Sequence, residues 1–100
     1  MKRRIVEFSE DANADLAALY DWIADAASPA IAMGYIERLE AYCNKFDLGS
    51  ERGHSRDDLR PGLRIVGFER RVTIAFTVET ERVIILRLFY GGRNWDELVQ

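Results

Sequence analysis

Two arginines interrupt apolar runs in the second half of the chain. Arg64 and Arg87 each stand where a strand residue would by default be apolar. A guanidinium group can bind a carboxylate or a phosphate through two parallel hydrogen bonds, which lysine cannot do. If both strands present these residues on one uncovered face, they form a cationic patch that the loop arginines extend: Arg52, Arg56 and Arg60. The pattern predicts an anchor for phosphate or for acidic groups of a partner, and ion pairing with nearby carboxylates is the alternative.

The charge distribution supports a partner-binding role for the second half. The net charge is −3. Residues 1–50 carry 5 Lys/Arg against 9 Asp/Glu, whereas residues 51–100 carry 9 Arg against 8 Asp/Glu, with no lysine. The net charge alone neither favours nor excludes nucleic acid, and we expect no direct sequence-specific nucleic-acid binding. The alternative for the arginines is a solvated surface with scattered ion pairs.

Residues for acid–base catalysis are few. Cleavage of RNA through its 2′-hydroxyl group needs a base, an acid and cations that hold the phosphate. His54 is the single histidine and falls in a polar loop, while Tyr90 and Glu69 are weak candidates. Cys43 lies on the expected buried stripe of a helix, where cysteine behaves as a small hydrophobe. We therefore predict no catalytic residue, although an endoribonuclease remains the alternative.

No cofactor or metal is predicted. One cysteine and one histidine cannot supply a closed zinc site, and a single cysteine excludes an intrachain disulfide. Acidic residues at 7, 10 and 11 interrupt any export signal, and Val83-Ile84-Ile85-Leu86 is too short to span a membrane. These features predict a cytoplasmic protein.

The first half of the chain predicts a helical hairpin. Ser9 is a suitable N-cap for a helix that ends near Ala27, and Ser28-Pro29 is a second start signal. A residue or two between the helices forces them to fold back on each other. Trp22 lies off the apolar stripe of the first helix, and we expect it to be exposed and available to a partner.

The remaining chain predicts strands. A short strand at 3–8 precedes the helices, and a loop at 48–62 follows them. Strands at 63–68, 72–78 and 83–90 are joined by short turns, which makes them an antiparallel meander. In the last strand, strict alternation places Ile84, Leu86, Leu88 and Tyr90 on one face and Val83, Ile85, Arg87 and Phe89 on the other.

These elements combine into one α+β domain over residues 1–100. Its order is β-α-α-β-β-β, with a helical hairpin packed on one face of a four-stranded, mainly antiparallel sheet. We expect the other face to hold the arginines and to remain open. Gly91-Gly92 ends the last strand, and residues 93–98 are expected to form a final helical turn.

Three stretches, in this order and spacing, resemble the ParE toxin family of the ParE/RelE superfamily. They are Leu19-Tyr20-Asp21-Trp22-Ile23 after Phe8-Ser9, the segment Arg60-Pro61-Gly62-Leu63-Arg64, and the closing run from Ile85 to Arg93. The resemblance covers essentially the whole chain. At Tyr90 the sequence departs from ParE-like chains, which usually carry histidine there, and this argues further against a nuclease.

The resemblance implies the toxin of a type II toxin–antitoxin (plasmid stabilisation) module. Such a toxin binds and inhibits DNA gyrase, and a ParD-like antitoxin neutralises it by wrapping around it. We expect the antitoxin to bind a groove formed by Arg64, Arg87, Arg60 and Trp22. An arginine and a tryptophan that follow the Gly91-Gly92 pair suggest a target contact at Arg93 and Trp95. The alternatives are a RelE-like ribosome-dependent mRNA endoribonuclease and an inactive relative that binds only its antitoxin.

Overall fold

The structure is a computed structural model that describes residues 4–47 and 53–90. Two helices and five strands follow one another in the predicted order, and one of the five, the short strand β2 (His54–Ser55), was not predicted. The elements are β1 (Ile5–Phe8), α1 (Glu10–Ala26), α2 (Pro29–Asn44), the 3₁₀ turn η1 (Lys45–Asp47), β2 (His54–Ser55), β3 (Leu63–Phe68), β4 (Val72–Val78) and β5 (Arg82–Tyr90).

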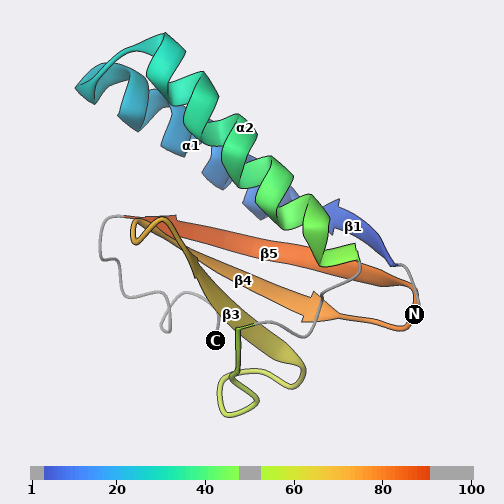
Figure 1. Cartoon of the computed structure of the whole chain (residues 1–100). Coiled ribbons are helices and arrows are strands. Elements are labelled where there is room, and N and C mark those ends of the chain that lie inside the picture. The colour runs from blue at the N-terminus through green and yellow to red at the C-terminus, as the bar shows by residue number, and fades with distance from the viewer. Residues whose placement is uncertain (1–3, 48–52, 91–100) are drawn as a thin grey trace.

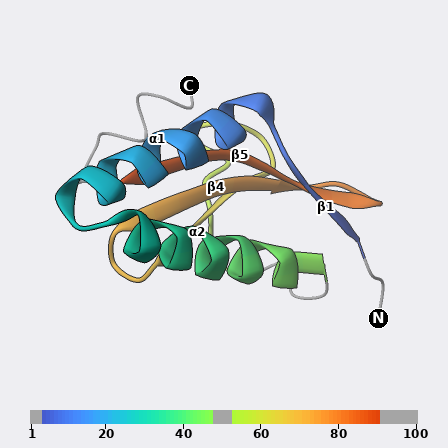
Figure 2. The same cartoon turned by 90° about the horizontal axis from the view of Figure 1, so that it is seen from above.

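The strands form one mixed sheet in the order β1-β5-β4-β3-β2. The β1 strand runs parallel to β5, and every other pair is antiparallel. The helices α1 and α2 lie side by side across one face of the sheet (Figures 1 and 2). The predicted two-layer α+β architecture is confirmed. The difference is β2, which pairs with β3 inside the segment predicted as a loop.

Both helices begin at the predicted serines. The Ser9 hydroxyl accepts a hydrogen bond from the Ala12 amide at 3.0 Å, and the Ser28 hydroxyl accepts one from the Ile31 amide at 3.1 Å. These bonds satisfy amides that the first helical turn leaves without a partner. Pro29 occupies the first turn of α2, where its missing N–H costs nothing.

The main core lies between the helices and the sheet. Phe46 and Phe76 are fully buried, and their ring centroids are 4.8 Å apart, which joins the end of the helical layer to the central strand β4. The apolar stripes of both helices pack on alternate residues of β4 and β5. The buried members of this cluster include Leu16, Leu19, Ile36, Leu39, Cys43, Ile74, Val83, Ile85 and Leu88.

A second, smaller cluster lies on the opposite face of the sheet. Leu63, Ala75 and Phe89 are buried there, and Leu59 and Ile65 pack against them together with Leu86. Because Ala75 alternates with Ile74 and Phe76, which face the helices, it must point away from them. The expectation of an open face is therefore wrong for this part of the sheet.

A β-bulge in β5 changes the alternation of its side chains. Phe76 pairs with Ile85 but Ala75 pairs with Arg87, so that Leu86 and Arg87 together oppose one residue of β4. Beyond the bulge, Leu88 and Tyr90 pack on the same side as Val83 and Ile85. The strict alternation predicted for this strand is wrong because the bulge inserts one residue.

Candidate functional site

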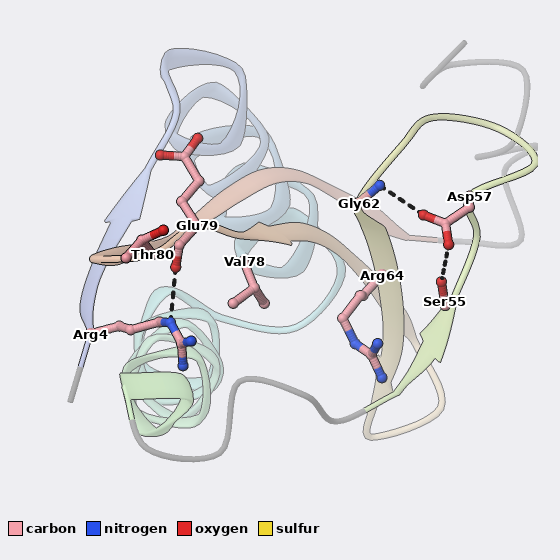
Figure 3. A pocket seen from close by; sticks show the side chains of 8 residues that line it. All are labelled: Arg4, Ser55, Asp57, Gly62, Arg64, Val78, Glu79 and Thr80. Carbon is pink, nitrogen blue, oxygen red and sulfur yellow. Dashed lines mark hydrogen bonds between the residues drawn. The ribbon is translucent and has the colours of Figure 1, made fainter. Parts of the chain in front are cut away.

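Two hollows among the described residues lie at opposite ends of β3. The first, which we call the Arg64 pocket, has a volume of about 410 Å³ and lies beside the start of β3 and the β4–β5 turn (Figure 3). The second, the Trp22 pocket, has a volume of about 470 Å³ and lies between the α1–α2 connection and the β3–β4 turn. Each contains one of the residues predicted to bind a partner.

The Arg64 pocket combines charged side chains from segments far apart in the sequence. Arg64 projects from β3 and Arg4 from the segment before β1, with Val78 between them (Figure 3). The Arg4 Nε donates to the Glu79 carbonyl oxygen at 2.9 Å, and the Arg64 Nη2 approaches the Gly53 carbonyl oxygen at 3.4 Å. The remaining lining residues are Ser55, Asp57, Gly62 and Thr80.

Asp57 organises the loop wall of this pocket. Its carboxylate accepts hydrogen bonds from the Gly62 amide at 2.8 Å and from the Ser55 hydroxyl at 3.0 Å. The bond from the Gly62 amide is the main reason that the pKa of Asp57 lies below its ordinary value, with Ser55 next. The carboxylate is thus ionised at neutral pH and is a poor proton donor.

Glycine is required where the loop meets β3. Gly53 has φ +77°, and a Cβ atom there would lie 2.1 Å from the Ile65 carbonyl oxygen. No side chain fits at that distance from the backbone, so the β2 segment can pack against β3 only with glycine at this position. This close approach brings Ser55 alongside Arg64 in the strand register.

The pocket has both positive and negative groups. Arg4, Arg64, Asp57 and Glu79 all line it, and the Glu79 carboxylate binds Arg82 at 2.7 Å. The guanidinium groups of Arg4 and Arg64, on either side of Val78, can each pair with a carboxylate (Figure 3).

Arg87 is held by an acidic side chain of α1. Its Nε and Nη2 donate to the two oxygens of Asp15 at 2.8 and 3.1 Å, and the Asp15 carboxylate also accepts the Leu88 amide at 2.9 Å. The bond to Asp15 is the main cause that raises the pKa of Arg87 above its ordinary value. The prediction of an arginine presented freely on an open face is wrong for Arg87.

Arg64 and Arg87 also lie on opposite faces of the sheet. Arg64 pairs with Phe76, which packs beneath the helices, whereas Arg87 pairs with Ala75, which faces away. Side chains of directly paired residues project from the same face. The guanidinium of Arg87 lies 5.0 Å from the ring centre of Phe89 and reaches Asp15 from that side. The predicted single cationic patch is therefore not formed.

Trp22 is exposed, as predicted from its position off the apolar stripe. Its side chain is 45 % exposed, and its ring lies 5.4 Å from the ring of Tyr90. The Trp22 pocket is lined by residues of both helices and of the β3–β4 turn, namely Ile23, Ala26, Ala27, Ile31, Tyr35, Arg38, Glu69 and Arg71.

The other predicted residues lie apart from these pockets or outside the described residues. Arg60 is exposed in the loop before β3, and His54 is exposed in β2. Arg93 and Trp95, and the helical turn expected at 93–98, lie outside the described residues. Arg4, Asp15 and the Arg38–Glu69 pair were not predicted. For Asp15 a signal existed, because its i, i+4 spacing from Leu19 places an acid on the buried stripe of α1.

Cys43 is fully buried in the main core. Burial, followed by the nearby charge of Glu40, raises the pKa of its thiol to about 12. Within residues 4–47 and 53–90, no group of three or more His, Cys, Asp and Glu side chains is placed to hold a metal ion. The helices in the same ranges include none long and apolar enough to cross a membrane.

We expect Cys43 to resist thiol reagents in the folded protein. With a pKa near 12, the thiolate fraction is negligible at mildly alkaline pH, and the reactive form appears only as the pH rises toward that value or the chain unfolds. The measurement is the rate of reaction with Ellman's reagent in buffer and in guanidinium chloride. A native rate equal to the denatured rate would contradict the buried position.

The helices and the sheet define a class of small two-layer α+β folds in which a helical hairpin covers one face of a mixed sheet. The chain is similar over 88 % of its length, and over 96 % of the other chain, to a solved structure described as the chromosomal ParDE TA system from P. aeruginosa. The TM-score is 0.77 and the sequence identity 24 %, a likeness that shows the fold. A search of curated proteins gave no match.

The family follows from the sequence match. Residues 6–95 match the family described as the ParE toxin of the type II toxin–antitoxin system parDE. This match spans most of the chain, and the protein belongs to the ParE toxin family. The resemblance drawn from the three sequence stretches is confirmed.

Proposed function

We propose that this ParE-family toxin acts by binding DNA gyrase and inhibiting it without catalysing a reaction. We propose further that a ParD-like antitoxin neutralises it in the cytoplasm. The proposal rests on membership of the ParE family. It is supported by the contents of the Arg64 pocket: its described lining residues include no histidine, and the Asp57 carboxylate accepts hydrogen bonds from Gly62 and Ser55.

A ribosome-dependent endoribonuclease is the second candidate, and the positions of the arginines weigh against it. Such an enzyme needs several cations around one phosphate. Arg64 and Arg87 project from opposite faces, and Arg87 is bound to Asp15. These two residues therefore do not supply a shared phosphate site.

The antitoxin would contact Arg64, Arg60, Trp22 and Arg87. Arg64 and Arg4 offer guanidinium groups to carboxylates of the antitoxin, and Trp22 offers an exposed apolar surface. The side chain of Arg87 keeps 23 % of its surface exposed, so a second carboxylate could approach it while Asp15 remains bound. An extended antitoxin tail that orders on binding could reach several of these residues at once.

The test is a supercoiling assay with purified protein beside a translation reaction. We expect inhibition of gyrase supercoiling and intact ribosome-bound mRNA. Cleavage of A-site mRNA that is lost in Arg64→Ala would replace the proposal with the nuclease, and normal growth on expression without antitoxin would indicate an inactive relative. A chain ending at residue 92 tests the proposed target contacts Arg93 and Trp95, because inhibition that survives this deletion would remove them.

A further inference from the structure

The Arg64 pocket carries guanidinium groups from two separate segments of the chain. Arg64 projects from β3 and Arg4 from the segment before β1, on either side of the half-buried Val78 (Figure 3). The Arg4 Nε donates to the Glu79 carbonyl oxygen at 2.9 Å, which holds this side chain at the β4–β5 turn. A guanidinium group has five N–H donors, so it can keep such a backbone contact and bind an anion as well.

The two carboxylates of this pocket are bound to other groups. Asp57 accepts hydrogen bonds from the Gly62 amide and the Ser55 hydroxyl. The Glu79 carboxylate accepts one from Arg82 at 2.7 Å and points away from the guanidinium groups of the pocket (Figure 3). These hydrogen bonds offset part of the negative charge of the two carboxylates. The pocket is therefore suited to an incoming anion despite its mixed charge.

A phosphate group matches this lining better than a carboxylate does. Arginine binds phosphate through paired hydrogen bonds, and arginine and threonine side chains both bind the phosphates of a DNA backbone. Thr80 adds a hydroxyl group to the lining that contains Arg4 and Arg64. The oxygens of a tetrahedral phosphate point in several directions, whereas the two oxygens of a carboxylate lie in one plane. Donors on different walls of the pocket can therefore bind one phosphate at the same time.

The acidic helical layer limits how the chain can contact nucleic acid. Residues 10–44 contain seven Asp/Glu against one Arg. Six of these acids are exposed, namely Glu10, Asp11, Asp21, Asp25, Glu37 and Glu40. Such a surface repels a phosphate backbone, and the net charge of −3 weakens binding to free DNA. A contact with one phosphate therefore contributes where another protein already holds the DNA close to the pocket.

We propose that the Arg64 pocket binds a backbone phosphate of the DNA that gyrase holds, through the guanidinium groups of Arg4 and Arg64. This inference rests on the proposed function, because gyrase supplies the DNA. Phosphate contacts carry no sequence information, so no sequence preference follows. The phosphate is bound and not cleaved, because the ionised Asp57 is a poor proton donor. An antitoxin carboxylate at Arg64 would exclude the phosphate, so the two partners compete for one pocket.

The test compares the affinity of the full chain for purified gyrase alone and for gyrase that carries a bound DNA duplex, measured by biolayer interferometry. We expect the wild type to bind the gyrase–DNA complex roughly 10-fold more tightly, as for one charge-assisted contact. This gain should shrink as the salt concentration rises. The double variant Arg4→Ala with Arg64→Ala should bind both forms of gyrase with equal affinity, and circular dichroism checks that it is folded.

Arg70→Ala is the matched control, since Arg70 is exposed at the β3–β4 turn and does not line the pocket. We expect this variant to keep the wild-type gain within about twofold. A gain that survives in the double variant, or that is lost equally in Arg70→Ala, would overturn the inference, as would equal binding of the wild type to both forms of gyrase. In each of these cases the proposed function stands, because the wild type still binds gyrase. Failure of the wild type to bind gyrase in either form would overturn both.

Discussion

Asp15→Ala is expected to lower the free energy of unfolding by about 3–5 kcal/mol. The substitution leaves the partly buried guanidinium of Arg87 without its partner and removes the acceptor of the Leu88 amide. β1 pairs with β5 only as far as Ile85. Beyond that residue the Asp15–Arg87 pair joins α1 to β5, and the substitution removes this contact. Urea unfolding followed by circular dichroism measures the change.

Two variants make this prediction specific. Asp25→Ala removes an exposed acid from the same helix and should change stability by less than about 0.5 kcal/mol. The double variant Asp15→Leu with Arg87→Met replaces the ion pair by apolar side chains and should recover part of the loss, since the Leu88 amide still lacks its acceptor. A loss in Asp15→Ala no larger than that in Asp25→Ala would show that the pair does not hold α1 to the sheet.

The position of this ion pair explains which parts of the fold were predictable. Ser9 and Ser28 mark helix starts through hydrogen bonds to amides three residues away, and such local rules can be derived from sequence. The strands from 63 onward follow from alternation and short turns. Asp15 and Arg87 are 72 residues apart, and their pairing depends on how α1 crosses β5.

The face assignment of the arginines failed for a related reason. Alternation along β5 predicts which face of the sheet each side chain occupies only when the strand pairing is regular. The bulge opposite Ala75 adds one residue, and no local sequence motif indicates it. Without it, Arg87 would share a face with Val83 and Ile85. The bulge instead turns Arg87 away from the helices, so that the charged group reaches Asp15 at the side of the strand.

The two pockets also combine residues that are far apart in the sequence, which sequence patterns cannot bring together. The exposure of Trp22 was predictable because helical periodicity is local. Arg4 could not be placed in the same pocket as Arg64, since the two are brought together only by the pairing of β1 with the first residues of β5 and of β3 with β4. The position of Tyr35 in the wall of the Trp22 pocket could not be predicted either, because a tyrosine on an apolar stripe is expected to belong to the core.

Phe76→Ala is expected to destabilise the protein by about 3–5 kcal/mol, while Leu59→Ala costs less than about 1.5 kcal/mol. Phe76 is fully buried and packs on Phe46, so its removal opens a cavity between the layers that neighbouring side chains cannot close. Leu59 is only partly buried on the smaller cluster of the other face. Denaturant unfolding of both variants measures the difference.

Phe76→Leu, which keeps most of the buried volume, is the control for Phe76→Ala and should lose clearly less stability. Equal losses in Phe76→Ala and Leu59→Ala would mean that both faces of the sheet stabilise the fold equally. A dominant loss at Phe76 would instead assign most of the stability to the helix-covered face. The loop that carries Asp57 and Gly62 beside the Arg64 pocket could then adjust to a partner at little cost, because the core that supports β3 and β4 lies on the other side of the sheet from Leu59.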